Sequence, residues 1–219
     1  MPEMTDIYIH HRIDCRPLQW STTAETIQAE AAARIGDAGG SLYGIWRSQI
    51  GLPRDTITAV TVWPDTDSAI RMGDLLHDEM ESVETVELDL MSPTLRPATA
   101  DAPVRQGNYA FRWFETPPEN FEEFLDLCEA AWPGFESSFG SQVIGLWRVE
   151  GSDDGPIRTL LMTRRPNLAM WERSKIPADA TEREVRKKLS RRYELCDWTT
   201  VYTTTLLTAE DEQDTVRWT

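Results

Sequence analysis

Hydrophobic and polar residues alternate at the start of the chain and then change to a helical spacing. Ile7, Ile9 and Ile13 alternate with polar neighbours, which predicts a strand. Residues 27–35 then place apolar side chains four apart, which predicts a helix that ends at Gly39-Gly40. The pattern further predicts a hairpin of strands 41–50 and 55–63, a helix over 65–76 and a strand over 84–90.

The same order of elements returns after a stretch rich in proline and small residues. The first elements predicted there are a strand over 108–115 and a helix that begins at Pro117 and ends at Pro133-Gly134. They are followed by a hairpin of strands 141–151 and 156–164, helices over 167–171 and 181–194, and a strand over 198–207. The two hairpins also share a motif, because Gly44-Ile45-Trp46-Arg47 matches Gly145-Leu146-Trp147-Arg148. The sequence therefore contains an internal repeat.

A strand-helix-strand-strand-helix-strand unit folds as a ferredoxin-like antiparallel sheet with two helices on one face. We therefore predict an α+β fold of tandem ferredoxin-like βαββαβ units that form an intramolecular dimeric α/β-barrel. The first unit spans residues 1–96, the linker 97–107, and the second unit, with an added helix, 108–219. If the bare sheet faces cover each other, the chain is a monomer with an internal pseudo-two-fold, or a homo-oligomer through outer surfaces.

Composition narrows the classes of partner. The 219 residues include 37 acidic and 22 basic side chains, for a net charge of −15, which argues against a nucleic-acid or membrane partner. The three cysteines, Cys15, Cys128 and Cys196, form no CxxC pair, so we expect free thiols, no metal site and a cytoplasmic protein.

The second unit carries a family resemblance. Its aromatic first strand is followed by PPENFEEFLDLCEAAW, GLWRVEG and TRRPNLAMWER, and GIWR and VWPDTDSAI repeat the frame more faintly in the first unit. In these motifs the chain resembles the NIPSNAP family of the dimeric α/β-barrel superfamily. The resemblance implies a fold and a paired arrangement, whereas relatives in the superfamily include heme-binding proteins, cofactor-free monooxygenases and proteins of unknown role.

Aromatic and basic residues on the predicted strands are the candidate ligand-binding groups. The tryptophans are Trp46, Trp63, Trp113, Trp147 and Trp198. They could line a cavity for a flat apolar ligand or simply pack the core. The arginines are Arg12, Arg47, Arg112 and Arg148. Each could hold a ligand carboxylate or pair with a carboxylate of the chain, such as Asp14, Glu115 or Glu150.

Two histidines and one basic run complete the candidates. His10 and His11 are neighbours on one strand, so they point to opposite faces and cannot chelate one metal together. Either could ligate a heme, serve as a general base or be a hydrogen-bonded structural residue. The basic run from Arg183 to Arg192 is either an anion-docking patch or the solvated face of a helix.

The sequence contains no dinucleotide, Walker, HExxH or GxSxG motif, and no catalytic residue can be assigned. Three functional hypotheses stay open. The first is a protein that binds a small apolar or planar ligand in an aromatic cavity. The second is a cofactor-free monooxygenase or a heme-binding or heme-degrading enzyme. The third is a scaffold for protein interaction, so whether the protein is an enzyme is undecided.

Overall fold

The computed structural model describes residues 6–77, 80–151 and 155–211. The chain divides into two compact units. Unit 1 comprises the described parts of Met1–Pro93, Ala98–Gln106 and Thr203–Thr219, and unit 2 comprises Thr94–Pro97 and Gly107–Tyr202. Each unit has its own hydrophobic core between a sheet and its helices.

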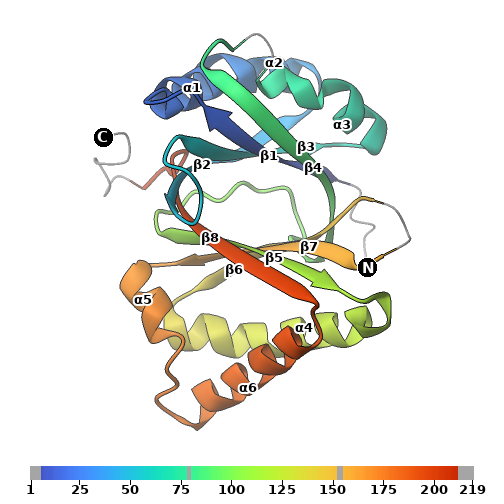
Figure 1. Cartoon of the computed structure of the whole chain (residues 1–219), viewed down its shortest axis with the longest axis vertical. Coiled ribbons are helices and arrows are strands. Elements are labelled where there is room, and N and C mark those ends of the chain that lie inside the picture. Colours follow the sequence, from blue (N-terminus) through green and yellow to red (C-terminus); the bar gives the residue numbers. More distant parts are fainter. Residues whose placement is uncertain (1–5, 78–79, 152–154, 212–219) are drawn as a thin grey trace. The chain divides into compact units, whose positions relative to one another are not determined.

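Unit 1 is an antiparallel sheet with helices on one face (Figure 1). Its strands are β1 (Ile7–Cys15), β2 (Ser41–Ile50), β3 (Thr56–Trp63) and the first part of β4 (Val83–Arg96). Its helical elements are α1 (Trp20–Thr26), the π-helical turn η1 (Ile27–Ala31), α2 (Ala32–Asp37), α3 (Thr66–Met72) and the 3-10 turn η2 (Gly73–Leu76). All eight residues of β3 are buried, because it lies between β1 and β2 at the centre of the sheet.

Unit 2 repeats this arrangement with one additional helix. Its strands are β5 (Asn108–Thr116), β6 (Gln142–Val149), β7 (Ile157–Arg165) and the first part of β8 (Trp198–Leu206). Its helical elements are the 3-10 turn η3 (Pro118–Asn120), α4 (Phe121–Phe139), α5 (Leu168–Arg173) and α6 (Ala180–Glu194). The helices α4, α5 and α6 lie on one side of these strands (Figure 1). The predicted turn residues 152–154 lie outside the described residues.

The eight strands follow one another by hydrogen bonding in the closed order β1-β3-β2-β8-β5-β7-β6-β4. Two long strands, β4 and β8, each contribute residues to both units. The predicted α+β fold of tandem ferredoxin-like units is thereby confirmed. No helix in the described part of the chain is long and apolar enough to cross a bilayer.

Two elements are longer than the sequence pattern predicts. The strand expected over 84–90 continues to Arg96, and the Thr94 hydroxyl donates to the Leu146 carbonyl at 2.8 Å. The helix expected to end at Pro133-Gly134 continues to Phe139 and ends at Gly140, which has the left-handed φ of 53° that glycine favours. Burial of Phe135 and Phe139 beyond the proline outweighs the hydrogen bond that the proline removes.

The shared Gly-x-Trp motif has a steric cause. A Cβ on Gly44 would lie 2.6 Å from the indole ring of Trp46, and a Cβ on Gly145 would lie 2.3 Å from that of Trp147. Each indole therefore folds back over the glycine two residues earlier, on the same face of its strand. Only glycine leaves room for this packing, which explains why the motif occurs in both hairpins.

Candidate anion-binding cavity

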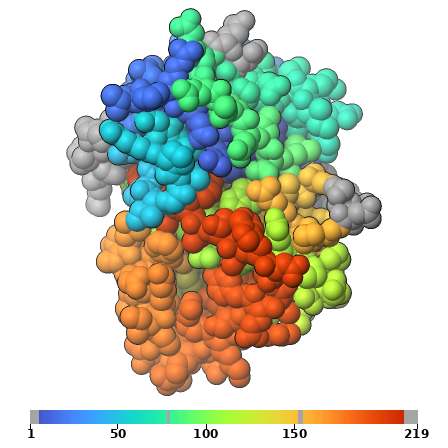
Figure 2. Space-filling view, viewed as in Figure 1, coloured from blue at the N-terminus to red at the C-terminus, as the bar shows by residue number. Residues whose placement is uncertain are grey.

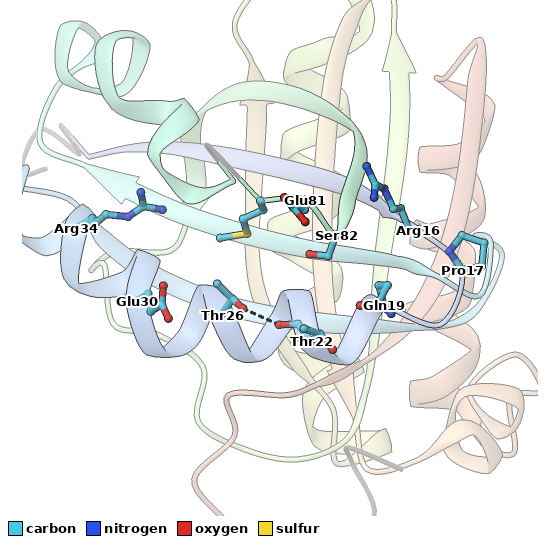
Figure 3. A pocket seen from close by; sticks show the side chains of 10 residues that line it. Arg16, Pro17, Gln19, Thr22, Thr26, Glu30, Arg34, Glu81 and Ser82 are labelled. Atoms are coloured by element: carbon cyan, nitrogen blue, oxygen red, sulfur yellow. Dashed lines mark hydrogen bonds between the residues drawn. The ribbon is translucent and has the colours of Figure 1, made fainter.

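Unit 1 has a polar groove on its surface. It has a volume of about 800 Å³ and runs between the helical segment α1 to α2 and residues 80–82 (Figure 3). Its charged side chains are balanced, with Arg16 and Arg34 against Glu30 and Glu81, and none of its lining residues is buried. A surface groove of this kind has no feature that selects a ligand.

The hollow of unit 2 is smaller and lies between its sheet and its helices. Its volume is about 170 Å³. The helices α5 and α6 that cover it are orange to orange-red at the surface of unit 2 in Figure 2. The lining residues are Ala110, Arg112, Trp132, Phe135, Val143, Leu161, Thr163, Arg165, Trp171, Ser174, Lys175, Arg186, Leu189, Arg192 and Tyr193.

This lining is strongly cationic in a chain that is acidic overall. It includes four arginines and one lysine, and no aspartate or glutamate. Lys175 has a carboxylate partner outside the lining, since its Nζ lies 2.9 Å from Glu172 Oε2. In the part of the chain that the structure describes, Arg112, Arg165 and Arg192 have no carboxylate within ion-pair distance. Buried cations without counter-charges are costly, so the cavity is suited to an anion.

Arg165 and Arg192 are the most deeply buried of these cations. Arg165 is 8% exposed; its Nη1 donates to Thr163 Oγ1 at 3.0 Å, and its guanidinium lies 5.0 Å from the centre of the Phe135 ring. Arg192 is 3% exposed; its Nη1 contacts Cys128 Sγ at 3.5 Å, and its guanidinium lies 4.8 Å from the Phe114 ring centre. The Nε of each arginine is buried without a hydrogen-bond partner. Each guanidinium therefore carries one buried donor that the described protein does not satisfy.

Arg112 adds a third guanidinium from strand β5, and it lies 5.4 Å from the centre of the Tyr193 ring. Burial lowers the pKa of Arg112, and the positive charges of Arg192 and Arg186 lower it further. Burial, with a contribution from the charge of Arg112, lowers the pKa of Arg165 to about 10. Burial thus disfavours the charged form of Arg112 and Arg165. Burial also acts to lower the pKa of Arg192, but its interactions with Cys128 and Tyr193 raise that pKa above its ordinary value.

Strand register shows what unit 1 has in place of this cavity. Ile9 pairs with Thr61 in unit 1, as Ala110 pairs with Thr163 in unit 2, so Ile9 corresponds to Ala110 and Trp63 to Arg165. In the same register His11 corresponds to Arg112. In unit 1 the larger side chains of Ile9 and Trp63 belong to the packed core. In unit 2 the small Ala110 and the charged Arg165 line an open space instead.

The predicted tryptophans do not line this cavity. Trp46, Trp63, Trp113 and Trp147 are buried in the packing of their units, whereas Trp198 is 44% exposed. Trp63 donates from Nε1 to Thr61 Oγ1 at 2.9 Å, and Arg158 lies 4.5 Å from the Trp113 ring centre. The cavity takes its indoles from Trp132 and Trp171, which lie on helices.

The arginines predicted from the sequence differ in the face of the strand on which they lie. Arg112 lines the cavity. Arg12 is one register position away from the residue of unit 1 that corresponds to Arg112, and it lies 3.5 Å from Glu87 and 3.8 Å from Asp14. Arg47 lies 4.6 Å from the Trp20 ring centre, and Arg148 is exposed. Arg12 therefore pairs with carboxylates of the chain, whereas Arg112 faces the cavity.

The histidines lie in unit 1 and do not line the cavity of unit 2. His10 Nδ1 lies 3.1 Å from Asp89 Oδ2, and His11 Nε2 lies 3.0 Å from Thr61 Oγ1. The His11 ring also lies 6.0 Å from that of His77. Because the chain has no histidine after His77, a heme with a histidine ligand does not fit the cavity of unit 2. The described residues contain no cluster of metal-ligating side chains.

Sequence reasoning missed most of the cavity residues. Arg186 and Arg192 belong to the basic run for which the sequence allows either an anion-docking patch or a solvated helix face, and both side chains line the cavity. Arg191, by contrast, pairs with Glu123 at 2.8 Å on the exposed side. The available signal was helical spacing, because Val185, Leu189 and Arg192 share one stripe of α6.

Comparison with known proteins shows the fold of the chain and no closer relationship. No protein-family model matches the chain. No curated protein matches it in sequence. Solved structures that resemble it have TM-scores near 0.6 at low identity.

One such structure is a candidate monooxygenase from Lactobacillus acidophilus NCFM, with a TM-score of 0.61, 10% identity, and coverage of 92% of this chain and 94% of that one. A second is an anthrone oxidase-like protein, with a TM-score of 0.59, 13% identity, and coverage of 94% and 92%. A third is a mutant of chlorite dismutase from Candidatus Nitrospira defluvii, with a TM-score of 0.63, 6% identity, and coverage of 93% and 92%. The chain shares the dimeric α/β-barrel fold of these proteins.

Proposed function

We propose that the protein binds a small organic anion in the cavity of unit 2. The observation that carries the proposal is the burial of Arg165 and Arg192, each with a free Nε, in a lining that contains no carboxylate. An anion in the same cavity would offset the cost of burying these charges. The proposal keeps the small planar ligand expected from the sequence and adds a negative charge to it.

Calorimetric titration of the full chain tests this proposal with sodium acetate, sodium benzoate and sodium phosphate as probes. We expect saturable binding of at least one probe, weakened by about 10-fold or more in Arg165→Gln, because a charge-assisted hydrogen bond contributes about 1.5–3 kcal/mol. Arg158→Gln is the matched control, since Arg158 is an exposed residue of the same strand and does not line the cavity. Absence of binding by all three anions would overturn the proposal.

Oxygenation of the bound anion is a second candidate function. A candidate monooxygenase and an anthrone oxidase-like protein share this fold, and the cavity brings Trp132 and Tyr193 beside the arginines. Oxygen uptake measured with an electrode, in the presence of an anion that binds, tests it. If the anion binds without oxygen uptake, this second candidate function is wrong and the first proposal, a ligand-binding protein, stands. Membership of the NIPSNAP family stays a prediction from the shared motifs.

A further inference from the structure

We infer that the anion is a carboxylate attached directly to a single aromatic ring. This inference rests on the proposed function, because it names the class of anion that the same cavity would take. Three features of the lining support it: the size of the space, the two buried guanidinium groups and the nature of the remaining walls.

The size of the space limits the ligand to about one ring. A volume of about 170 Å³ is close to that of the cavities of about 150 Å³ that accept benzene in protein interiors. Larger planar groups, such as a fused-ring system or a nucleotide, would have to displace Trp132 or Phe135, which are buried in the core of unit 2. A single ring with one small substituent fits without such a change.

The two most deeply buried guanidinium groups of the lining favour a carboxylate. The Nε of Arg165 and the Nε of Arg192 each lack an acceptor, and the two side chains line the same cavity. A carboxylate has two oxygens in one plane, so it can accept from two guanidinium groups at once. The other three cations of the lining need the ligand less, because Lys175 pairs with Glu172 and because Arg112 and Arg186 are only half-buried.

The remaining walls favour an aromatic body over an inorganic ion. Trp132, Phe135 and Leu189 present apolar surface in the same space as the arginines. Arg112 and Arg165 already lie over the rings of Tyr193 and Phe135. An aryl carboxylate is flat, so its ring can follow these aromatic faces while the carboxylate lies in the plane of a guanidinium. An inorganic anion would leave the apolar walls without a partner.

The test compares four ligands that differ in one property each, titrated into the full chain at pH 7.5. They are benzoate, acetate without the ring, cyclohexanecarboxylate without aromaticity, and benzamide without the charge. We expect benzoate to bind at least 10-fold more tightly than acetate. We expect it to bind about 3-fold more tightly than cyclohexanecarboxylate. Benzamide should show no saturable binding. Phenyl phosphate is the fifth probe, and we expect it to bind more weakly than benzoate.

A size variant separates ring recognition from anion recognition. Ala110 lines the cavity where unit 1 has the larger Ile9, so Ala110→Leu should exclude the ring while it leaves the arginines in place. Benzoate binding should fall at least 10-fold in this variant, and acetate binding should persist, which also shows that the variant is folded. Arg158→Gln should leave both affinities unchanged.

The outcomes distinguish the two proposals. If acetate binds through Arg165 but benzoate binds no more tightly, the cavity takes anions and the aromatic inference is wrong. If phenyl phosphate binds more tightly than benzoate, the carboxylate part of the inference is wrong. If no anion binds, the proposed function fails together with the inference.

Discussion

Trp63 and Arg165 occupy equivalent register positions at the ends of β3 and β7, and each donates a hydrogen bond to the threonine two residues before it. The acceptors are Thr61 Oγ1 at 2.9 Å and Thr163 Oγ1 at 3.0 Å. The repeat has therefore kept the hydrogen bond and changed the side chain that makes it. An indole fills the core of unit 1, whereas a guanidinium lines a cavity in unit 2.

Arg165→Met should stabilise the protein in the absence of ligand. The methionine removes a buried cation that has no carboxylate partner, and replacement of buried charges by apolar residues of similar size is often neutral or stabilising by about 1–4 kcal/mol. Because the stacking on Phe135 is lost, we expect a gain in the free energy of unfolding of about 1 kcal/mol, measured by urea denaturation. Arg158→Met should instead lower this free energy by up to about 1 kcal/mol, because it loses the stacking on Trp113 and removes no charge from the cavity. A loss of more than 2 kcal/mol in Arg165→Met would show that the arginine is structural.

His11 should make the protein less stable in mild acid. Burial, together with the charges of His77 and His10, lowers the pKa of His11 well below its ordinary value of 6.5. The unfolded chain therefore takes up a proton near pH 6.5 that the folded protein does not, so this contribution is fully present above pH 6.5 and is lost as the pH falls.

We expect the contribution to fall by up to about 1.4 kcal/mol per pH unit below 6.5. Urea denaturation at pH 7.5 and 5.5 measures it, and His11→Gln should show a smaller difference between the two values than the wild type. An equal pH dependence in both proteins would contradict the assignment.

Gly145→Ala should destabilise the protein through its neighbour Trp147. A methyl group at this position would lie 2.3 Å from the indole, so the ring must move within a packed core. Overpacking of this kind costs about 1–3 kcal/mol, which thermal denaturation would detect as a lower melting temperature. Gly36→Ala is the matched control, because nothing lies within 4 Å of its Cβ position in α2. A gain or no change is expected there, since alanine favours a helix.

The three thiols should be free and slow to react in the native protein. Cys15, Cys128 and Cys196 form no disulfide in the structure, as the sequence predicted. Burial raises the pKa of Cys15 to about 11 and also raises the pKa values of Cys128 and Cys196. At pH 8 about one Cys15 side chain in a thousand would then be in the thiolate form.

Titration with Ellman's reagent should find the half-buried Cys196 reacting first, and all three thiols in urea. Cys196→Ser should remove the first phase. A native protein with fewer than three titratable thiols after denaturation would contradict the prediction.

The sequence by itself determined the order of elements and the repeat. Alternation and helical spacing depend on local geometry, so β1, β3, β5 and β7 could be predicted from residue patterns alone. The Gly-x-Trp motif is also local, because both residues lie on one face of one strand. The errors occurred where burial outweighed a local signal, as at Pro133, where the helix continues.

Only the tertiary structure decided which charges meet. Arg12 and Arg112 are similar in sequence context, but a shift of one register position turns them to opposite faces of their strands, and only the face beneath the helices holds the cavity. Arg165 ends a strand and Arg192 lies in a helix that begins after it, so no spacing rule connects them. They come together because α6 packs on the same side of the sheet as α4, and that packing is set by the burial of apolar surface rather than by the basic residues themselves.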